Sequence, residues 1–231
     1  MSNYQHLFFD LDHTLWDYEA NAAEVLDDLY HRHTLGKIIN SGSRHFTEVF
    51  FEINNRLWDQ YDRGLIHKSV IRNERFDRIL AAFGVSNSRL AKTINLAFIS
   101  ECPYKTNVIP GAVELLSHLR PKFGIHIITN GFREIQWIKI AKSGLDKFID
   151  QVFISEEIGA RKPDPKFFEF SLNKVECTRA QSVVIGDNLN TDIKGARDYG
   201  IDHIFYNPKK LTHTDRVTWE INHLSQIPEL I

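Results

Sequence analysis

The sequence is poor in cysteine, almost neutral in net charge and free of long apolar runs. Its two cysteines, Cys102 and Cys177, show no C-x-x-C spacing, which argues against a disulfide framework or a zinc cluster. A formal net charge of −2 gives no basic surface of the kind that binds nucleic acid. No stretch approaches ~18 consecutive apolar residues, and the first residues lack the pattern of a signal peptide. We therefore expect no nucleic-acid partner, no membrane association and a reducing, cytoplasmic location.

The eleven histidines and four tryptophans form no binding motif either. No H-x-x-x-H or H-E-x-x-H arrangement with further ligand types occurs, so solvated surface is the better interpretation of the histidines. The tryptophans are scattered and give no stacking platform for single strands. With 231 residues and 42% hydrophobic content, the chain can bury a substantial core, either as one large α/β domain or as a core with an insertion.

Two aspartates follow an apolar run near the start of the chain. Residues 7–9, Leu-Phe-Phe, lead into Asp10-Leu11-Asp12-His13-Thr14. The run is typical of a buried parallel strand, and in an open α/β sheet the ligand site lies outside the carboxyl ends of the strands. Because side chains alternate along a strand, the two aspartates share a face. A helix cap or a surface turn is the structural alternative, since Asp and Thr favour both.

Three later segments have the same design. Apolar runs at 125–128 and 182–185 are each followed by polar residues, and a basic residue stands just ahead of a predicted helix between them. The residues concerned are Thr129, Asn130, Gly131, Lys162, Gly186, Asp187 and Asp192. Parallel strands end at one edge of their sheet, so we expect these clusters to meet there.

With these segments in this order, the chain resembles the haloacid dehalogenase-like hydrolase superfamily. The four motifs of that superfamily are Asp-x-Asp-x-Thr, a Thr or Ser, a Lys, and Gly-Asp with a trailing Asp. They are represented here by Asp10-Leu11-Asp12-His13-Thr14, Thr129, Lys162, Gly186-Asp187 and Asp192. Segments 128–132 and 154–163 are similar to the nucleotide-phosphatase branch that cleaves pyrimidine and noncanonical nucleoside monophosphates. The resemblance covers nearly the whole chain, with His13 standing where many members carry Gly.

The order of elements predicts two structural parts. From residue 115 onward, strand-like and helix-like stretches alternate, which indicates parallel strands joined by right-handed crossovers. Predicted strands lie at 125–128, 152–154, 182–185 and 203–205, and predicted helices at 111–122, 132–143, 165–175 and 191–199.

Between residues 16 and 108 only helical periodicity is convincing. Helices are predicted at 23–30, 46–61, 71–83 and 90–98. The predicted fold class is α/β: a doubly wound, Rossmann-like parallel sheet core, residues 1–16 and 108–231, with an inserted all-α, four-helix cap, residues 17–107. Such an insertion can act as a lid, and in the resembled superfamily helical caps go with small-molecule substrates.

Phosphoryl-transfer chemistry and the resemblance together assign roles to the motif residues. Asp10 is the expected nucleophile, forming an aspartyl-phosphate, and Asp12 the expected general acid and then base. Asp12 also separates two reactions, because a halide leaves without a proton and a dehalogenase has no need of this residue. Thr129 and the backbone N–H of Asn130 are expected to hold the transferred oxygens, while Lys162 supplies positive charge.

Mg²⁺ is the expected cofactor, because it prefers oxygen ligands and neutralises the charge of a phosphate monoester. Asp10 and Asp187 are the expected side-chain ligands. The resemblance adds the backbone carbonyl of Asp12 and places Asp192 either on a bound water or beside Lys162.

Several neighbouring polar residues have simpler explanations. Asp164 directly precedes Pro165, so it is interpreted as a helix N-cap and left out of the site. Asp192 as a cap of its helix, and Thr14 as a residue that only ties down the first loop, are alternatives that the sequence leaves open. Asn188 is expected in a turn.

Substrate identity is expected to depend on the inserted region. Asn54, Trp58 and Tyr61 recur at helical spacing beside an apolar stripe, so the aromatic rings can stack on a base and the amide can bind its edge. The competing interpretation is that these residues belong to the core of the insertion.

The sequence thus predicts a Mg²⁺-dependent phosphomonoester hydrolase that acts through an aspartyl-phosphate on small phosphorylated metabolites, nucleoside 5′-monophosphates first. A sugar-phosphate or phosphoglycolate phosphatase is the alternative, followed by a phosphomutase. A non-catalytic binding protein is the candidate from a different class. A monomer and a homodimer are both compatible with the sequence.

Overall fold

The computed structural model describes residues 3–231, and these form two compact units. One unit comprises the chain up to Tyr18 together with Thr106–Ile231, and the other is Glu19–Lys105. Within residues 3–231, no helix combines the length and apolar character needed to cross a bilayer.

The first unit contains a six-stranded sheet in the order β3-β2-β1-β4-β5-β6, and each neighbouring pair is parallel. The strands are β1 (His6–Phe9), β2 (Gly124–Thr129), β3 (Gln151–Ile154), β4 (Ser182–Gly186), β5 (Asp202–Tyr206) and β6 (Trp219–Ile221). The strand order reverses at β1, which lies between β2 and β4, and ligands of doubly wound sheets bind at this position. The predicted strands are confirmed, whereas β6 was not predicted.

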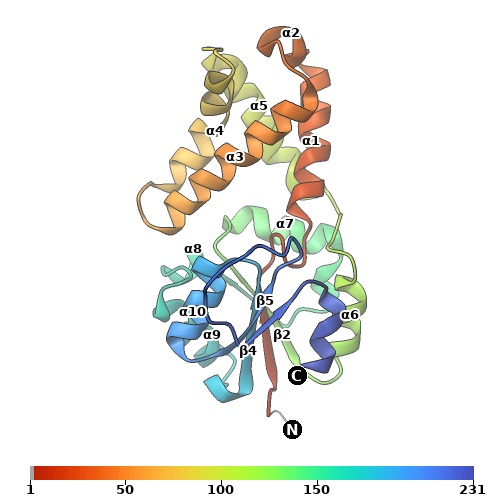
Figure 1. Cartoon of the computed structure of the whole chain (residues 1–231), viewed down its shortest axis with the longest axis vertical. Helices are drawn as coiled ribbons and strands as arrows, with labels where there is room; N and C mark the ends of the chain where they lie inside the picture. Colours follow the sequence, from red (N-terminus) through yellow and green to blue (C-terminus); the bar gives the residue numbers. More distant parts are fainter. Residues whose placement is uncertain (1–2) are drawn as a thin grey trace. The chain divides into compact units, whose positions relative to one another are not determined.

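Helices cover both faces of this sheet, with α9 and α10 on one side of the strands and α6 on the other (Figure 1). The α-helices of the unit are α6 (Ala112–Leu119), α7 (Arg133–Ser143), α8 (Ser155–Ile158), α9 (Pro165–Lys174) and α10 (Lys194–Tyr199). A π-helical turn, Leu189–Ile193, leads into α10, and short 3₁₀ turns occupy Leu145–Lys147, Arg179–Gln181 and Leu224–Glu229. The doubly wound α/β core is therefore confirmed.

The core between the sheet and α9 fixes the position of the strand ends. Phe8 and Val184 are register partners on β1 and β4 and share one face of the sheet. They belong to a buried cluster with Phe167 and Phe168 of α9 and Ala196 of α10. Burying aromatic side chains of this size contributes about 1.5–3 kcal/mol each, so β1 and β4 are held firmly side by side.

The second unit is helical. Its helices are α1 (Tyr18–Arg32), α2 (Leu35–Ile39), α3 (Ser43–Asp62), α4 (Lys68–Ala82) and α5 (Ser88–Glu101), followed by the 3₁₀ turn Cys102–Tyr104. The four long helices lie where the periodicity predicts them, and the short α2 is an addition. Phe50 of α3 packs against Phe76 and Phe98, with ring centroids 5.7 and 4.9 Å away.

Candidate active site

The loop after β1 turns sharply and carries both aspartates of the first motif. Asp10 continues the strand ladder, because its N–H donates to the carbonyl of Ile185 on β4 at 2.8 Å. The N–H groups of Leu15 and Trp16 both donate to the carbonyl of Leu11, which closes the turn. His13 adopts a left-handed conformation with φ of 67°, which glycine reaches without strain and which histidine adopts more readily than most residues. His13 therefore adopts a backbone conformation that favours glycine.

Asp10 lies in a buried ion pair with Lys162, which the loop before α9 delivers. The Lys162 Nζ lies 2.6 Å from Asp10 Oδ1 and 2.6 Å from Asp192 Oδ1, and it also donates to the carbonyl of Ile128 at 3.0 Å. The contacts with Asp10 and Ile128 are hydrogen bonds, and the contact with Asp192 is an ion pair. Although burial by itself lowers the pKa of the lysine, the carboxylates of Asp10 and Asp192 raise it above its ordinary value. Lys162 is therefore a fixed positive charge beside Asp10.

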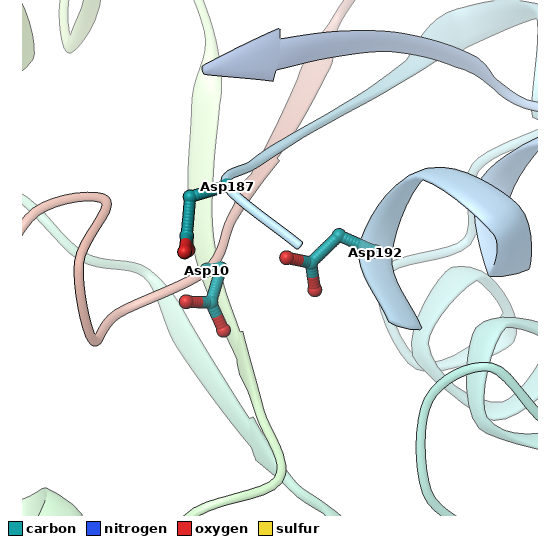
Figure 2. Close-up of side chains that lie close together, drawn as sticks. All are labelled: Asp10, Asp187 and Asp192. Carbon is teal, nitrogen blue, oxygen red and sulfur yellow. The ribbon is translucent and has the colours of Figure 1, made fainter. Parts of the chain in front are cut away.

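A third carboxylate, that of Asp187, joins this cluster from the position directly after β4. Oxygen atoms of Asp10, Asp187 and Asp192 all lie within 4.8 Å of one another, and in Figure 2 the carboxylates of Asp187 and Asp192 turn toward Asp10. The hydroxyl of Thr14 donates to Asp187 Oδ1 at 3.0 Å, so Thr14 orients a member of the cluster. The N–H of Asn188 donates to Asp192 Oδ2 at 3.1 Å.

The charge balance of the cluster fits a divalent cation. Burial raises the pKa of Asp10 well above its ordinary value, and Asp192 and Asp187 add to this rise against the opposing effect of Lys162. Burial likewise raises the pKa of Asp187 to about 6, and Asp192 contributes, while His13 and Thr14 act in the opposite direction. Three close carboxylates exceed what one ammonium neutralises. Carboxylate oxygens are the ligands that Mg²⁺ prefers, so the donor set matches that ion.

Asp12 lies in separate surroundings, bound to α7 by both of its oxygens. Lys139 Nζ lies 2.6 Å from Asp12 Oδ1, and Gln136 Nε2 donates to Asp12 Oδ2 at 2.8 Å. Burial raises the pKa of the Asp12 carboxyl, but the charge and hydrogen bonds of Lys139 and the hydrogen bond of Gln136 outweigh it, so the pKa is lower than usual. The surroundings of the two first-motif aspartates thus shift their pKa values in opposite directions: the pKa of Asp10 is raised and that of Asp12 is lowered.

Thr129, the last residue of β2, offers a hydrogen-bond donor at the same edge of the sheet. Thr129 Oγ1 accepts hydrogen bonds from the N–H of Gly131 at 3.0 Å and from Gln136 Nε2 at 2.6 Å. A hydroxyl has two acceptor positions and one donor, so these bonds leave the O–H of Thr129 to act as a donor. Asn130 uses its side chain to hold the backbone of Lys162, donating to its carbonyl at 2.9 Å and accepting from its N–H at 3.0 Å.

Glycines at two of these positions make room for site side chains. A Cβ on Gly131 would collide with the side chain of Gln136, and a Cβ on Gly186 would collide with the carboxylate of Asp192. At these positions a glycine is therefore required by close approach of neighbouring atoms, rather than by the turn alone.

The remaining predicted residues have more varied surroundings. Asp164 is the N-cap of α9, accepting from the N–H of Lys166 at 2.9 Å, as predicted. Asn54 is 2% exposed on α3 and accepts a hydrogen bond from Arg75 at 3.0 Å, so its carbonyl oxygen already has a partner inside the helical unit. Trp58 is partly exposed and meets Tyr61 edge-on with ring centroids 5.7 Å apart. Substrate binding by Asn54 and Trp58 stays a prediction.

Gln136 and Lys139 were not among the predicted site residues. Both are buried on α7, at 0% and 5% exposure, and they share its inner face with Phe132 and Ile140. The signal that could have revealed them is the pattern itself: an amide and an ammonium group occupy two positions of a stripe that should be apolar.

Comparisons with known proteins show which family the chain belongs to. The family model for haloacid dehalogenase-like hydrolases matches residues 4–200. The pyrimidine 5′-nucleotidase PynA of Streptococcus pneumoniae (strain ATCC BAA-255 / R6) is 32% identical over 94% of this chain and 91% of its own length. A glyceraldehyde 3-phosphate phosphatase of Methanothermobacter thermautotrophicus is 28% identical over 97% of this chain and 98% of its own. The magnesium-bound crystal structure of the HAD-hydrolase YfnB from Bacillus subtilis superposes with a TM-score of 0.88 at 26% identity, covering 98% of each chain.

Proposed function

The chain belongs to the haloacid dehalogenase-like hydrolases and is a phosphatase of that family, and from this premise we propose that it is a Mg²⁺-dependent phosphomonoesterase acting on nucleoside 5′-monophosphates. The observation that carries the proposal is the separation of two aspartates two residues apart. Asp10 lies against Lys162 and close to the carboxylates of Asp187 and Asp192, whereas Asp12 is held apart by Lys139. One carboxylate is thus placed to react and the other to transfer protons, which is the division of labour that phosphate ester hydrolysis requires.

In the proposed first half of the reaction, Asp10 attacks phosphorus and forms an aspartyl-phosphate. Lys162 neutralises the approaching charges, and the Thr129 O–H donates to a phosphoryl oxygen. Asp10, Asp187 and Asp192 would hold Mg²⁺, Asp192 directly or through a water molecule, and the carbonyl of Asp12 would complete this set as predicted. When bound, the ion supplies the positive charge that offsets the repulsion between a carboxylate and a phosphate dianion.

Asp12 would transfer the protons in both halves of the reaction. Its proton goes to the oxygen of the leaving alcohol, and the resulting carboxylate then takes a proton from the water that hydrolyses the aspartyl-phosphate. A dehalogenase would need no proton donor for its leaving group, so the buried support of Asp12 by Lys139 and Gln136 favours phosphate esters.

Nucleotides are proposed as substrates because PynA, a pyrimidine 5′-nucleotidase, is similar to almost the whole chain. We propose that the helical insertion, residues 17–107, contributes base recognition through Asn54 and Trp58. A sugar-phosphate phosphatase is the second candidate, favoured by the similarity to a glyceraldehyde 3-phosphate phosphatase.

A substrate panel tests the proposal. Purified protein is assayed with pyrimidine and purine nucleoside 5′-monophosphates, glyceraldehyde 3-phosphate, phosphoglycolate and p-nitrophenyl phosphate, with Mg²⁺ and with a chelator. We expect the highest kcat/KM with a nucleotide, activity only with Mg²⁺, and loss of turnover in Asp10→Asn with the fold intact. Activity of Asp10→Asn near wild type would contradict the assigned nucleophile, and a higher kcat/KM for a sugar phosphate would favour the second candidate.

A further inference from the structure

Two buried side chains of α7, Gln136 and Lys139, both bind the carboxylate of Asp12. Lys139 and Gln136 lie three residues apart, and each contacts a different oxygen of the Asp12 carboxylate, at 2.6 and 2.8 Å. Burying an ammonium group and an amide on the inner face of a helix is costly unless each finds a partner. Hydrophobic residues would serve packing at least as well, so the polar pair requires another explanation.

The two contacts fix Asp12 in rotation as well as in position. A carboxylate held at one oxygen can still turn about its Cβ–Cγ bond, whereas one held at both oxygens cannot. Each contact occupies one lone pair of its oxygen, and the second lone pair stays available for the proton that the reaction transfers. Lys139 is itself confined, because its Nζ lies 4.5 Å from the ring centroid of Trp16, a fully buried side chain.

Gln136 also connects Asp12 to the phosphate-binding residue. Its Nε2 donates to Thr129 Oγ1 at 2.6 Å as well as to Asp12 Oδ2, so one amide group spans the two. Gly131 leaves the space through which this side chain passes. One amide group therefore links the proposed proton-transfer group to the hydroxyl that is proposed to bind the phosphoryl group.

We propose that Lys139 and Gln136 are positioning residues, which hold the Asp12 carboxylate at a fixed distance and orientation relative to the phosphoryl group bound by Thr129. This inference rests on the proposed phosphatase function. In the first half of the reaction, a carboxylate oxygen of Asp10 bonds to phosphorus, the bond from phosphorus to the leaving oxygen breaks, and Asp12 protonates that oxygen. In the second half, Asp12 takes a proton from water as the water oxygen bonds to phosphorus, and the bond from phosphorus to Asp10 breaks.

The test is a kinetic comparison of Lys139→Met with wild type on a nucleoside monophosphate and on p-nitrophenyl phosphate. Methionine keeps the unbranched side chain against Trp16 and removes the ammonium group. We expect kcat for the nucleotide to fall about 10²-fold with little change in KM, because misplacing a proton-transfer group by about 1 Å has an effect of that size.

With p-nitrophenyl phosphate we expect a burst. The nitrophenolate leaves without a proton, so Asp10 is still phosphorylated, while the water that must hydrolyse the aspartyl-phosphate lacks a correctly placed base. One equivalent of nitrophenolate should therefore appear rapidly, followed by slow turnover. A residue that serves packing alone would lower the active fraction and give no burst.

Three further variants complete the experiment. Lys139→Arg retains a cation and should recover most of kcat, whereas Lys142→Met, an exposed position on the same helix, should behave as wild type. Gln136→Met should give the same burst as Lys139→Met, and it decides the matter if Lys139→Met does not fold.

The outcomes separate this inference from the function on which it rests. Wild-type kcat in Lys139→Met and Gln136→Met, or equal losses on both substrates without a burst, would overturn the positioning role while leaving the phosphatase intact. A wild-type chain that hydrolyses none of the panel would instead overturn the proposed function.

Discussion

Asp187→Asn should stabilise the metal-free protein, because the wild-type side chain is a carboxylate held where its charge is disfavoured. Burial and Asp192 raise the pKa of Asp187 from 3.8 to about 6. A group whose pKa is higher in the folded state costs stability as the pH rises through that pKa, since the unfolded chain loses its proton first. One pKa unit corresponds to about 1.36 kcal/mol. The raised pKa of Asp187 therefore lowers the free energy of unfolding by about 3 kcal/mol at pH 8 and by about 1 kcal/mol at pH 4.5.

An asparagine removes this cost while keeping the Oδ1 acceptor for the hydroxyl of Thr14. For a chain of this length, about 1 kcal/mol corresponds to roughly 2–4 °C in Tm. We therefore expect Asp187→Asn to melt roughly 6–12 °C above wild type at pH 8 in chelator, and only roughly 2–4 °C above it at pH 4.5. Asp146→Asn, which removes an exposed carboxylate, serves as the control and should move Tm little at either pH.

Adding Mg²⁺ should nearly cancel the difference at pH 8. An ion present at about 100 times its Kd stabilises the folded state by about 2.7 kcal/mol, and this gain belongs to wild type because the variant lacks a ligand. Thermal melts of both proteins at the two pH values, with Mg²⁺ and with chelator, measure each quantity. A variant no more stable than wild type at pH 8 in chelator, or equally stabilised at both pH values, would refute the charge argument.

Two further substitutions probe the chemistry and the substrate. Asp12→Asn should lower kcat/KM for nucleotides by about 10²–10⁴ and affect p-nitrophenyl phosphate less, because nitrophenolate leaves without a proton; steady-state assays on both substrates check this, and equal losses would argue against Asp12 as the acid. Trp58→Ala should lower kcat/KM for nucleotides relative to p-nitrophenyl phosphate by on the order of tenfold if the ring stacks on the base, since stacking contributes about 1–3 kcal/mol. An unchanged ratio together with a lowered Tm would assign Trp58 to packing.

The central strands and the first-motif residues were predictable from sequence because their signals are local. Buried parallel strands such as β1 and β4 are short apolar runs, and the residues that follow them must lie at one edge of the sheet. Strand β6, Trp219–Ile221, was missed because three residues at the edge of a sheet, only partly buried, produce no such run. The π-helical turn that carries Asp192 overlaps the helix predicted over 191–199. Side-chain periodicity over five residues cannot distinguish a π-helix from an α-helix.

The support for Asp12 could not be derived in the same way. Lys139 lies 127 positions from Asp12 in the sequence, and only the crossover after β2 brings α7 to the loop after β1. Asn130 also has a contact that the sequence does not predict. We expect its backbone N–H to bind the phosphate, and in the structure its side chain forms two hydrogen bonds with the backbone of Lys162. Such contacts depend on tertiary packing, which no motif spacing encodes.

Two buried lysines give the two first-motif aspartates the separate surroundings on which their proposed roles rest. Lys162 pairs with Asp10 and Lys139 with Asp12. Burial raises the pKa of Asp10 despite Lys162, with Asp192 and Asp187 adding to the rise, whereas Lys139 and Gln136 outweigh burial and lower the pKa of Asp12. Without ligands, each shift is opposite to the proposed role, since a nucleophile must be ionised and an acid protonated. A divalent cation held by the three carboxylates would lower the pKa of Asp10, and a phosphate dianion near Asp12 would raise the pKa of that residue. Under the proposed function, the site would therefore reach its reactive protonation state only with the ion and the phosphate ester both bound.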